Sequence, residues 1–162
     1  MDIDVDPDGA WERLRASRWN PPGKAAEGRS RRKTYAAALE QTEQMFRAAA
    51  VVGPATRPLQ VFYGLSQAGR AIAAAAGALY GEDWRLVGHG IKASGLSDAF
   101  PDIEIRTEQP GTQGSFVRVS EVLNSPVWGK DAVRLEDMCN PAATPTSSGA
   151  SSYCIQKNGP RR

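Results

Sequence analysis

The residues best suited to chemistry follow one stripe of a predicted helix and the loop after it. Arginine keeps its charge, histidine titrates near neutrality, and phenol and amide groups exchange hydrogen bonds, as phosphate recognition or RNA cleavage requires. Arg70 and His89, the only histidine, are therefore candidate catalytic residues. The candidate ligand-binding set is Tyr63, Gln67, Arg70, His89 and Lys92, and Arg85 is an alternative to Lys92.

A structural interpretation of the same residues is also open. Arg70 can pair with a buried carboxylate or with carbonyl groups, and backbone hydrogen bonds can hold His89 in a loop. In that case the stripe contributes to packing and has no ligand.

A short basic cluster provides a second candidate site, for nucleic acid. It consists of Arg29, Arg31, Arg32 and Lys33. These cations can neutralise phosphates, and they lie near a predicted helix start, where the helix dipole disfavours positive charge. A solvated surface is the alternative, because no aromatic residue is interleaved and the formal net charge of the chain is only +2.

Other common sites are not indicated. The glycines of 88–90 and 111–114 fit turns, because neither group has the lysine of a P-loop or the strand and helix context of a dinucleotide fingerprint. One histidine with two distant cysteines, Cys139 and Cys154, gives no zinc ligand set, and free thiols are expected. We predict no metal and no cofactor.

The elements that position these residues are predicted to be mainly helical. A short helix is expected over residues 7–17, and apolar residues at steps of three and four predict a longer helix over 30–52. Gly53 and Pro54 end it, and Pro58 suits the first turn of the next helix, over 58–80. The two long helices are expected to form an antiparallel hairpin. The buried face of the first is predicted to be Tyr35, Leu39, Thr42, Met45, Phe46, Ala49 and Val52.

The helix over 58–80 is predicted to have three stripes. The apolar stripe is Leu59, Phe62, Leu65, Ile72, Ala76 and Leu79. Gly69, Ala73 and Gly77 stand four apart, so that a neighbouring backbone can approach closely. The polar stripe is Gln60, Tyr63, Gln67 and Arg70.

The second half of the chain is predicted to add a small β-hairpin to this helical core. Alternation over 103–107 and the apolar run 116–119 suggest two strands, and Pro110-Gly111 supplies turn chemistry between them. Ser120 is expected to cap a short helix through Asn124.

The predicted domain organisation is a flexible acidic lead-in over 1–10, one helical domain over 11–137, and a low-complexity disordered tail over 138–162. The first residues lack the cationic and apolar regions of a secretion signal, and no apolar run reaches the length of a membrane span. A cytoplasmic location is expected.

The chain resembles the YaaC-like family of bacterial proteins, a family without an established activity. The resemblance is carried by residues 58–65 (PLQVFYGL) with the helix that follows, by His89-Gly90-Ile91, and by Gly114-Ser115-Phe116 leading into 119–123. It spans about residues 11–137 and implies the N-terminal part of such a protein. The domain is therefore predicted to be incomplete, as a natural short form or a truncated or frame-shifted product.

These observations favour a non-enzymatic binding or assembly module over an enzyme. The module would self-associate or bind the missing helical half. The alternative is an RNA- or nucleotide-acting protein, because a helical hairpin with a conspicuous arginine and histidine resembles the HEPN class. The ribonuclease motif of that class, however, has more residues between its arginine and histidine than the three between Arg85 and His89. A truncated product without independent function is the third possibility.

Overall fold

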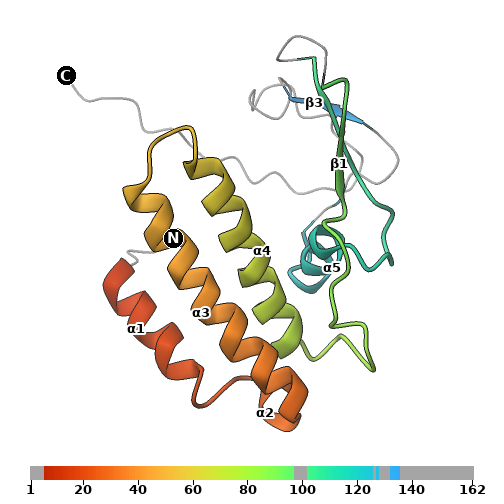
Figure 1. Cartoon of the computed structure of the whole chain (residues 1–162). Coiled ribbons are helices and arrows are strands. Elements are labelled where there is room, and N and C mark those ends of the chain that lie inside the picture. Colours follow the sequence, from red (N-terminus) through yellow and green to blue (C-terminus); the bar gives the residue numbers. More distant parts are fainter. Residues whose placement is uncertain (1–5, 97–101, 126, 128–131, 136–162) are drawn as a thin grey trace, which may run out of the picture.

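The computed structural model describes residues 6–96, 102–125, 127 and 132–135, and these residues form five helices and three strands (Figure 1). The helices are α1 (Pro7–Ser17), α2 (Lys24–Glu27), α3 (Arg29–Val51), α4 (Arg57–Ala75) and α5 (Ser115–Val122). The strands are β1 (Ile91–Ser94), β2 (Glu104–Thr107) and β3 (Val133–Arg134). The fold is therefore mainly α with a small antiparallel sheet, as predicted. The predicted tail, both cysteines and residues 1–5 lie outside the described residues.

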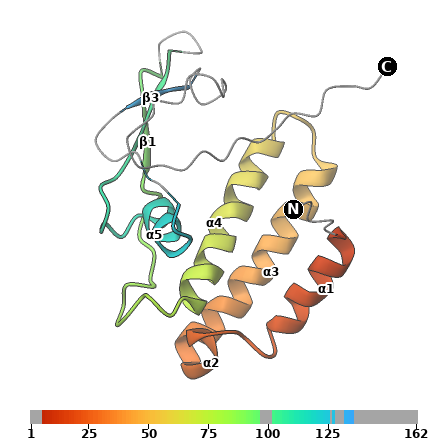
Figure 2. The ribbon, with the colours of Figure 1, turned by 180° about the vertical axis from the view of Figure 1, so that it is seen from behind.

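The helical hairpin of α3 and α4 is the centre of the fold. Seen from either side, α1 lies against α3, and α5 lies beside α4 on the face away from α3 (Figures 1 and 2). The predicted helix over 30–52 is confirmed, and its residues Tyr35, Leu39, Thr42 and Ala49 are buried. The predicted helix over 7–17 is also confirmed, with Asp6 as N-cap accepting from the amides of Asp8 and Gly9.

Helix α4 packs with its small residues inward and exposes large ones. Its buried positions are Gly64, Gly69, Ala71, Ala73 and Ala74. The predicted apolar face is wrong in its first half, since Leu59, Phe62 and Leu65 are 53%, 43% and 60% exposed. Small residues occupy the buried side of α4 because they let α3 approach closely. At Gly64, for example, a Cβ would lie only 3.2 Å from the Phe46 ring of α3.

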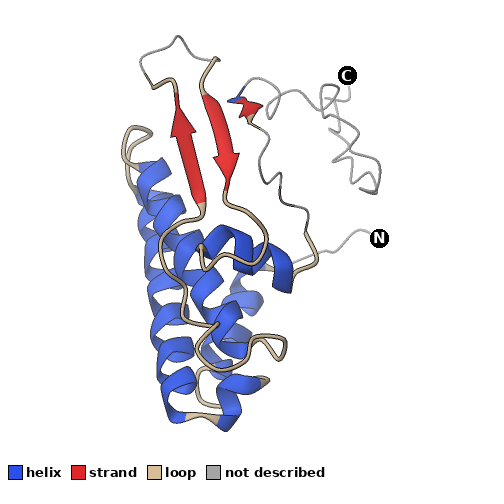
Figure 3. Ribbon diagram, turned by 90° about the vertical axis from the view of Figure 1, so that its right-hand side faces the viewer, coloured by secondary structure: helices blue, strands red, loops and turns tan. Residues whose placement is uncertain are grey.

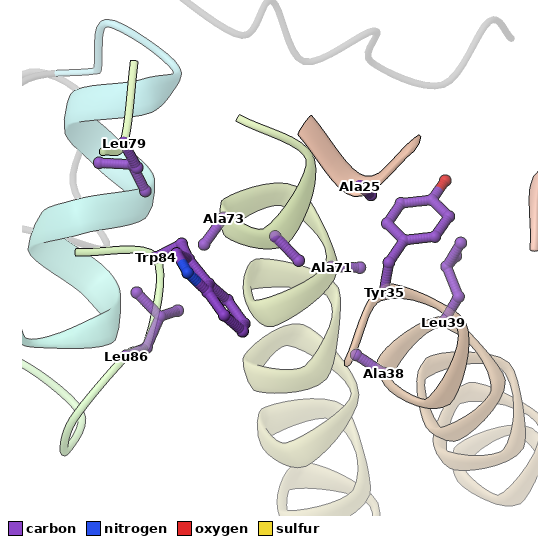
Figure 4. Packing of buried hydrophobic residues seen from close by; sticks show 10 residues of the cluster. Ala25, Tyr35, Ala38, Leu39, Ala71, Ala73, Leu79, Trp84 and Leu86 are labelled. Carbon is purple, nitrogen blue, oxygen red and sulfur yellow. The ribbon is translucent and has the colours of Figure 1, made fainter. Parts of the chain in front are cut away.

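The predicted end of this helix at Tyr80 is also wrong. Ala76 leaves the helix with φ −63° and ψ 128°, and Gly77 is exposed in the loop that follows. Gly77 is therefore no part of a close-packing stripe. Leu79 is buried as expected, but from this loop, together with Trp84 and Leu86 on one side of α4 (Figure 4). Figure 4 shows Tyr35 and Leu39 of α3 on the opposite side.

Each helix of the hairpin has an arginine near its start that hydrogen-bonds to carbonyl groups at the end of the other helix. Arg31, in the first turn of α3, donates from Nη1 to the carbonyls of Ala74 (3.4 Å) and Ala76 (3.1 Å) and from Nη2 to that of Leu79. Arg57, at the start of α4, donates to the carbonyls of Ala49 (3.0 Å) and Val52 (3.2 Å). Each helix thus supplies a side chain that satisfies carbonyls where the other helix ends.

The β-structure differs from the predicted hairpin. β2 pairs antiparallel with β1, in a register that sets Ile91 opposite Thr107, and with β3, which sets Ile105 opposite Val133 (Figure 3). The predicted second strand over 116–119 is wrong, because these residues belong to α5. The predicted cap at Ser120 is wrong as well: α5 begins at Ser115 and ends at Val122, before Asn124 with its positive φ of 52°. In α5 the helical side that holds Val117 and Ser120 is buried, and this packing overrides the strand propensity of valine and phenylalanine.

Glu43 joins α1 to α3 through an ion-pair network. Its Oε1 lies 2.6 Å from Arg15 Nη1 and 2.8 Å from Arg47 Nε, and its side chain is 13% exposed. Burial of Glu43 acts to raise the pKa of its carboxyl, but the hydrogen bonds and charges of Arg47 and Arg15 outweigh burial and lower that pKa below its ordinary value.

A pH dependence of stability follows from this network. A lowered folded-state pKa stabilises the fold above the unfolded pKa of glutamate, about 4.3, and this stabilisation is lost as the pH falls through the folded value. We expect Glu43→Gln to reduce the free energy of urea unfolding at pH 7, and the difference from wild type to shrink below about pH 4. Glu40→Gln, whose carboxylate is half exposed and 3.9 Å from Arg18, is the control with little effect. A difference between Glu43→Gln and wild type that does not change with pH would contradict this assignment.

Candidate functional site

The structure separates the predicted site residues into two places. Arg70 lines a hollow at the end of the hairpin where α3 begins and α4 ends, together with Ser30, Thr34 and the segment Trp84 to Leu86. His89 lines a different hollow, between α4 and α5. Arg70 and His89 therefore do not share one cavity.

The aromatic members of the predicted set, Tyr63 and His89, both contact the Phe62 ring of α4. The Phe62 ring contacts the His89 ring edge to face at 5.1 Å between centroids, and the Tyr63 ring at 5.4 Å. Tyr63 is about half exposed and Gln67 half-buried. Lys92 lies apart, on β1, with its Nζ 4.0 Å from the Glu108 carboxylate.

His89 is positioned by a close approach of two backbone segments. Its carbonyl accepts from the Phe116 amide (2.9 Å) and from Ser115 Oγ (3.2 Å). Gly90 and Gly114 permit this contact, because a Cβ on Gly114 would lie 2.5 Å from the Gly90 Cα. Backbone hydrogen bonds thus hold the segment around His89 against the start of α5, while the imidazole lies at the surface.

The hollow that His89 lines is an apolar groove, which we call the α4–α5 groove. It has a volume of about 480 Å³, within the range of ligand pockets. Its large apolar side chains are Phe62, Leu65, Ile72, Ile91, Phe116, Val119 and Leu123. No Asp, Glu, Lys or Arg occurs among the described residues that line it.

The floor of the groove is formed where α5 packs on α4. A Cβ on Gly69 would lie 3.0 Å from Val119 Cγ2, so the glycine allows α5 to lie close against α4. The prediction that Gly69 permits close approach of a neighbour is confirmed. The α5 wall of the groove has a helical signal in the sequence, because Phe116, Val119 and Leu123 recur at steps of three and four. The prediction of a strand over 116–119 missed this signal.

The hollow that Arg70 lines has a different character, and we call it the arginine hollow. It has a volume of about 380 Å³ and is lined by Ser30, Thr34, Arg70, Trp84, Arg85 and Leu86. The guanidinium carbons of Arg31 and Arg85 each lie 5.3 Å from the centroid of the Trp84 ring. This is a polar, positively charged surface around a buried indole.

The predicted basic cluster divides in the structure. Arg31 holds the end of α4, and Arg32 donates to the Ala26 carbonyl at 3.2 Å, so these two side chains have structural partners. Arg29 and Lys33 are exposed on the first turns of α3. The four side chains therefore do not present one continuous set of free charges.

The described part of the chain contains neither a cluster of metal ligands nor a helix that could span a membrane. No group of three or more His, Cys, Asp or Glu side chains there could hold a metal ion. No helix in this part combines the length and the apolar character that crossing a membrane requires.

Comparison with known proteins identifies one similarity. A family model described as YaaC-like Protein matches residues 11–144. This range takes in every described helix and strand except the first turn of α1. No curated protein and no solved structure matches the chain.

Proposed function

Because the chain belongs to the YaaC-like family, and the matched region contains the hairpin and α5 complete, we propose that this domain is a non-enzymatic assembly module that pairs with a second copy of itself through the α4–α5 groove. The observation that carries the proposal is the outward placement of large apolar side chains along α4, beside the half-buried Phe116 and Val119 of α5. Monomeric proteins rarely leave such side chains together on one surface without a partner.

The groove and its wall have the shape and charge that self-pairing requires. Leu59, Phe62 and Leu65 form an exposed apolar row on α4, and Phe62 and Leu65 are at the same time part of one wall of the groove. In a two-fold interface the same patch of each copy meets itself, so the α4 row of one copy can pack into the groove of the other. The described lining has no charged residue, and two copies therefore meet without repulsion between like charges.

A HEPN-like activity on RNA or nucleotides receives less support. It would require Arg70 and His89 to act on one substrate, but they line separate hollows, and the His89 ring packs on Phe62. Self-pairing requires no such joint action, and His89 then contributes to the wall of the groove.

The proposal is tested by the mass of the protein in solution. Leu65→Asp places a carboxylate in the apolar interface, and we expect it to raise the dimer dissociation constant by at least about 100-fold, since an unpaired buried charge costs several kcal/mol. Light scattering coupled to size-exclusion chromatography, over a range of protein concentrations, measures the change. Val51→Asp is the matched control, because Val51 is 84% exposed at the end of α3 and does not line the groove.

Two results would overturn the proposal. One is a wild-type protein that stays monomeric at every concentration, which would leave the groove for a different occupant. The other is a dimer that Leu65→Asp and Val51→Asp weaken equally, which would place the interface elsewhere. Circular dichroism of both variants separates loss of pairing from loss of fold.

A further inference from the structure

We propose that the arginine hollow binds the phosphate group of a small phosphorylated molecule. The proposal is independent of the α4–α5 groove. It starts from the juxtaposition of Arg70 and Arg85 with the hydroxyls of Ser30 and Thr34 around one cavity of about 380 Å³. These are the groups that bind phosphate oxygens: guanidinium groups donate pairs of charge-assisted hydrogen bonds, and hydroxyls add neutral ones.

The charges around this hollow are not balanced within the described structure. Arg70 makes no ion pair or hydrogen bond with any of the described residues, although its side chain is half-buried. Arg85 has one carboxylate partner, Glu82, which is 70% exposed, and Arg31 is also close by over the Trp84 ring. Three guanidinium groups against one exposed carboxylate leave a positive field in which an anion is stabilised.

Folding, rather than the sequence order, creates this arrangement. The antiparallel hairpin brings the first turns of α3 next to the last turns of α4, so residues 30 and 34 face residue 70. The loop after α4 then turns Trp84 into the core and leaves Arg85 at the surface. Because the indole is only 6% exposed, it supports the arginines and cannot stack on a base, which favours a compact phosphate monoester over a nucleic-acid strand.

The probe for the test is inorganic phosphate, titrated into the full chain at constant ionic strength and followed by ³¹P NMR, with chloride as the reference anion. We expect saturable binding that Arg70→Gln weakens about tenfold or more, because a charge-assisted bond is lost. Thr34→Val, which keeps the charge and the shape, should weaken binding less. Arg13→Gln removes the same charge at an exposed position of α1 that does not line the hollow, and it should change nothing.

Several outcomes would overturn the proposal. They are an absence of saturable phosphate binding by the wild type, equal effects of Arg70→Gln and Arg13→Gln, and Arg70-dependent binding of single-stranded RNA that is tighter, per phosphate group, than that of inorganic phosphate. The last would assign the hollow to nucleic acid instead. Leu65→Asp should leave phosphate binding unchanged, so this proposal and the assembly proposal can fail separately.

Discussion

Arg31→Met is expected to lower the free energy of unfolding by about 2–4 kcal/mol. The substitution removes the donors to three carbonyls beyond and within the last turn of α4, and hydrogen bonds to a charged group contribute about 1.5–3 kcal/mol. It also removes the cation over the Trp84 ring, a contact of about 0.5–2 kcal/mol. Urea unfolding, with equal denaturant dependence in both proteins, measures the loss.

The neighbouring arginine is the control for this prediction. Arg32 is exposed and makes one hydrogen bond, to the Ala26 carbonyl, so Arg32→Met should cost less than about 1 kcal/mol. Arg31→Lys should restore only part of the stability, because a single ammonium group cannot reach three carbonyls in a fixed fork. Equal losses for Arg31→Met and Arg32→Met would mean that the interactions of Arg31 add little.

Gly23→Ala is the second substitution with a large expected effect, about 2–4 kcal/mol of destabilisation. Gly23 precedes α2 with a φ of 52°, a conformation that costs a residue with a side chain about 1–3 kcal/mol. An added Cβ would also lie 2.4 Å from the carbonyl oxygen of Ala75, at the end of α4. The thermal midpoint and the urea midpoint should both fall.

A glycine at the other end of α2 is the control for this prediction. Gly28 follows α2 with a φ of −128°, and a Cβ there would meet nothing within 4 Å. We expect Gly28→Ala to remain within about 1 kcal/mol of wild type, since the gain from a stiffer unfolded chain offsets the weaker N-cap of α3. If the two alanine variants were equally stable, the contact between Gly23 and α4 would not contribute to the fold.

The sequence predicted α3 well because its burial follows the ordinary rule. Large apolar residues recur at helical spacing and face the core, so periodicity alone locates both the helix and its buried side. In α4 the same rule selected the wrong side. Ala71, Ala73 and Ala74 carry little hydrophobic signal, yet they are the residues that fit between α3 and the loop containing Trp84.

The wrong secondary-structure predictions after residue 80 share one physical cause: tertiary packing overrides the local propensity of the residues. Phe116, Val117 and Val119 have high strand propensity, but in the fold Val117 is fully buried from a helix whose start lies against Gly90. The true partners of β2 are residues 91–94, for which no strand was predicted, and residues 133–134. β3 is separated from β2 by α5, so that pairing leaves no short-range pattern in the sequence.

The candidate site could be predicted only in its residue types. Arg70, Arg85 and His89 were identified because their chemistry is visible in the sequence, whereas their separation into two hollows depends on which way α4 faces. The contribution of residues 30 and 34 depends on the antiparallel hairpin, which brings together positions about forty residues apart.

The reciprocal arginines of the hairpin have a consequence for how the molecule opens. The carbonyls where α4 ends are covered only while the first turn of α3 is folded, and those where α3 ends only while α4 has begun. Fraying at either end of the hairpin therefore breaks hydrogen bonds that belong to both helices. We therefore expect the amide protons of α3 and α4 to exchange as one cooperative unit, so that the surfaces on either side of α4 are lost together when the hairpin opens.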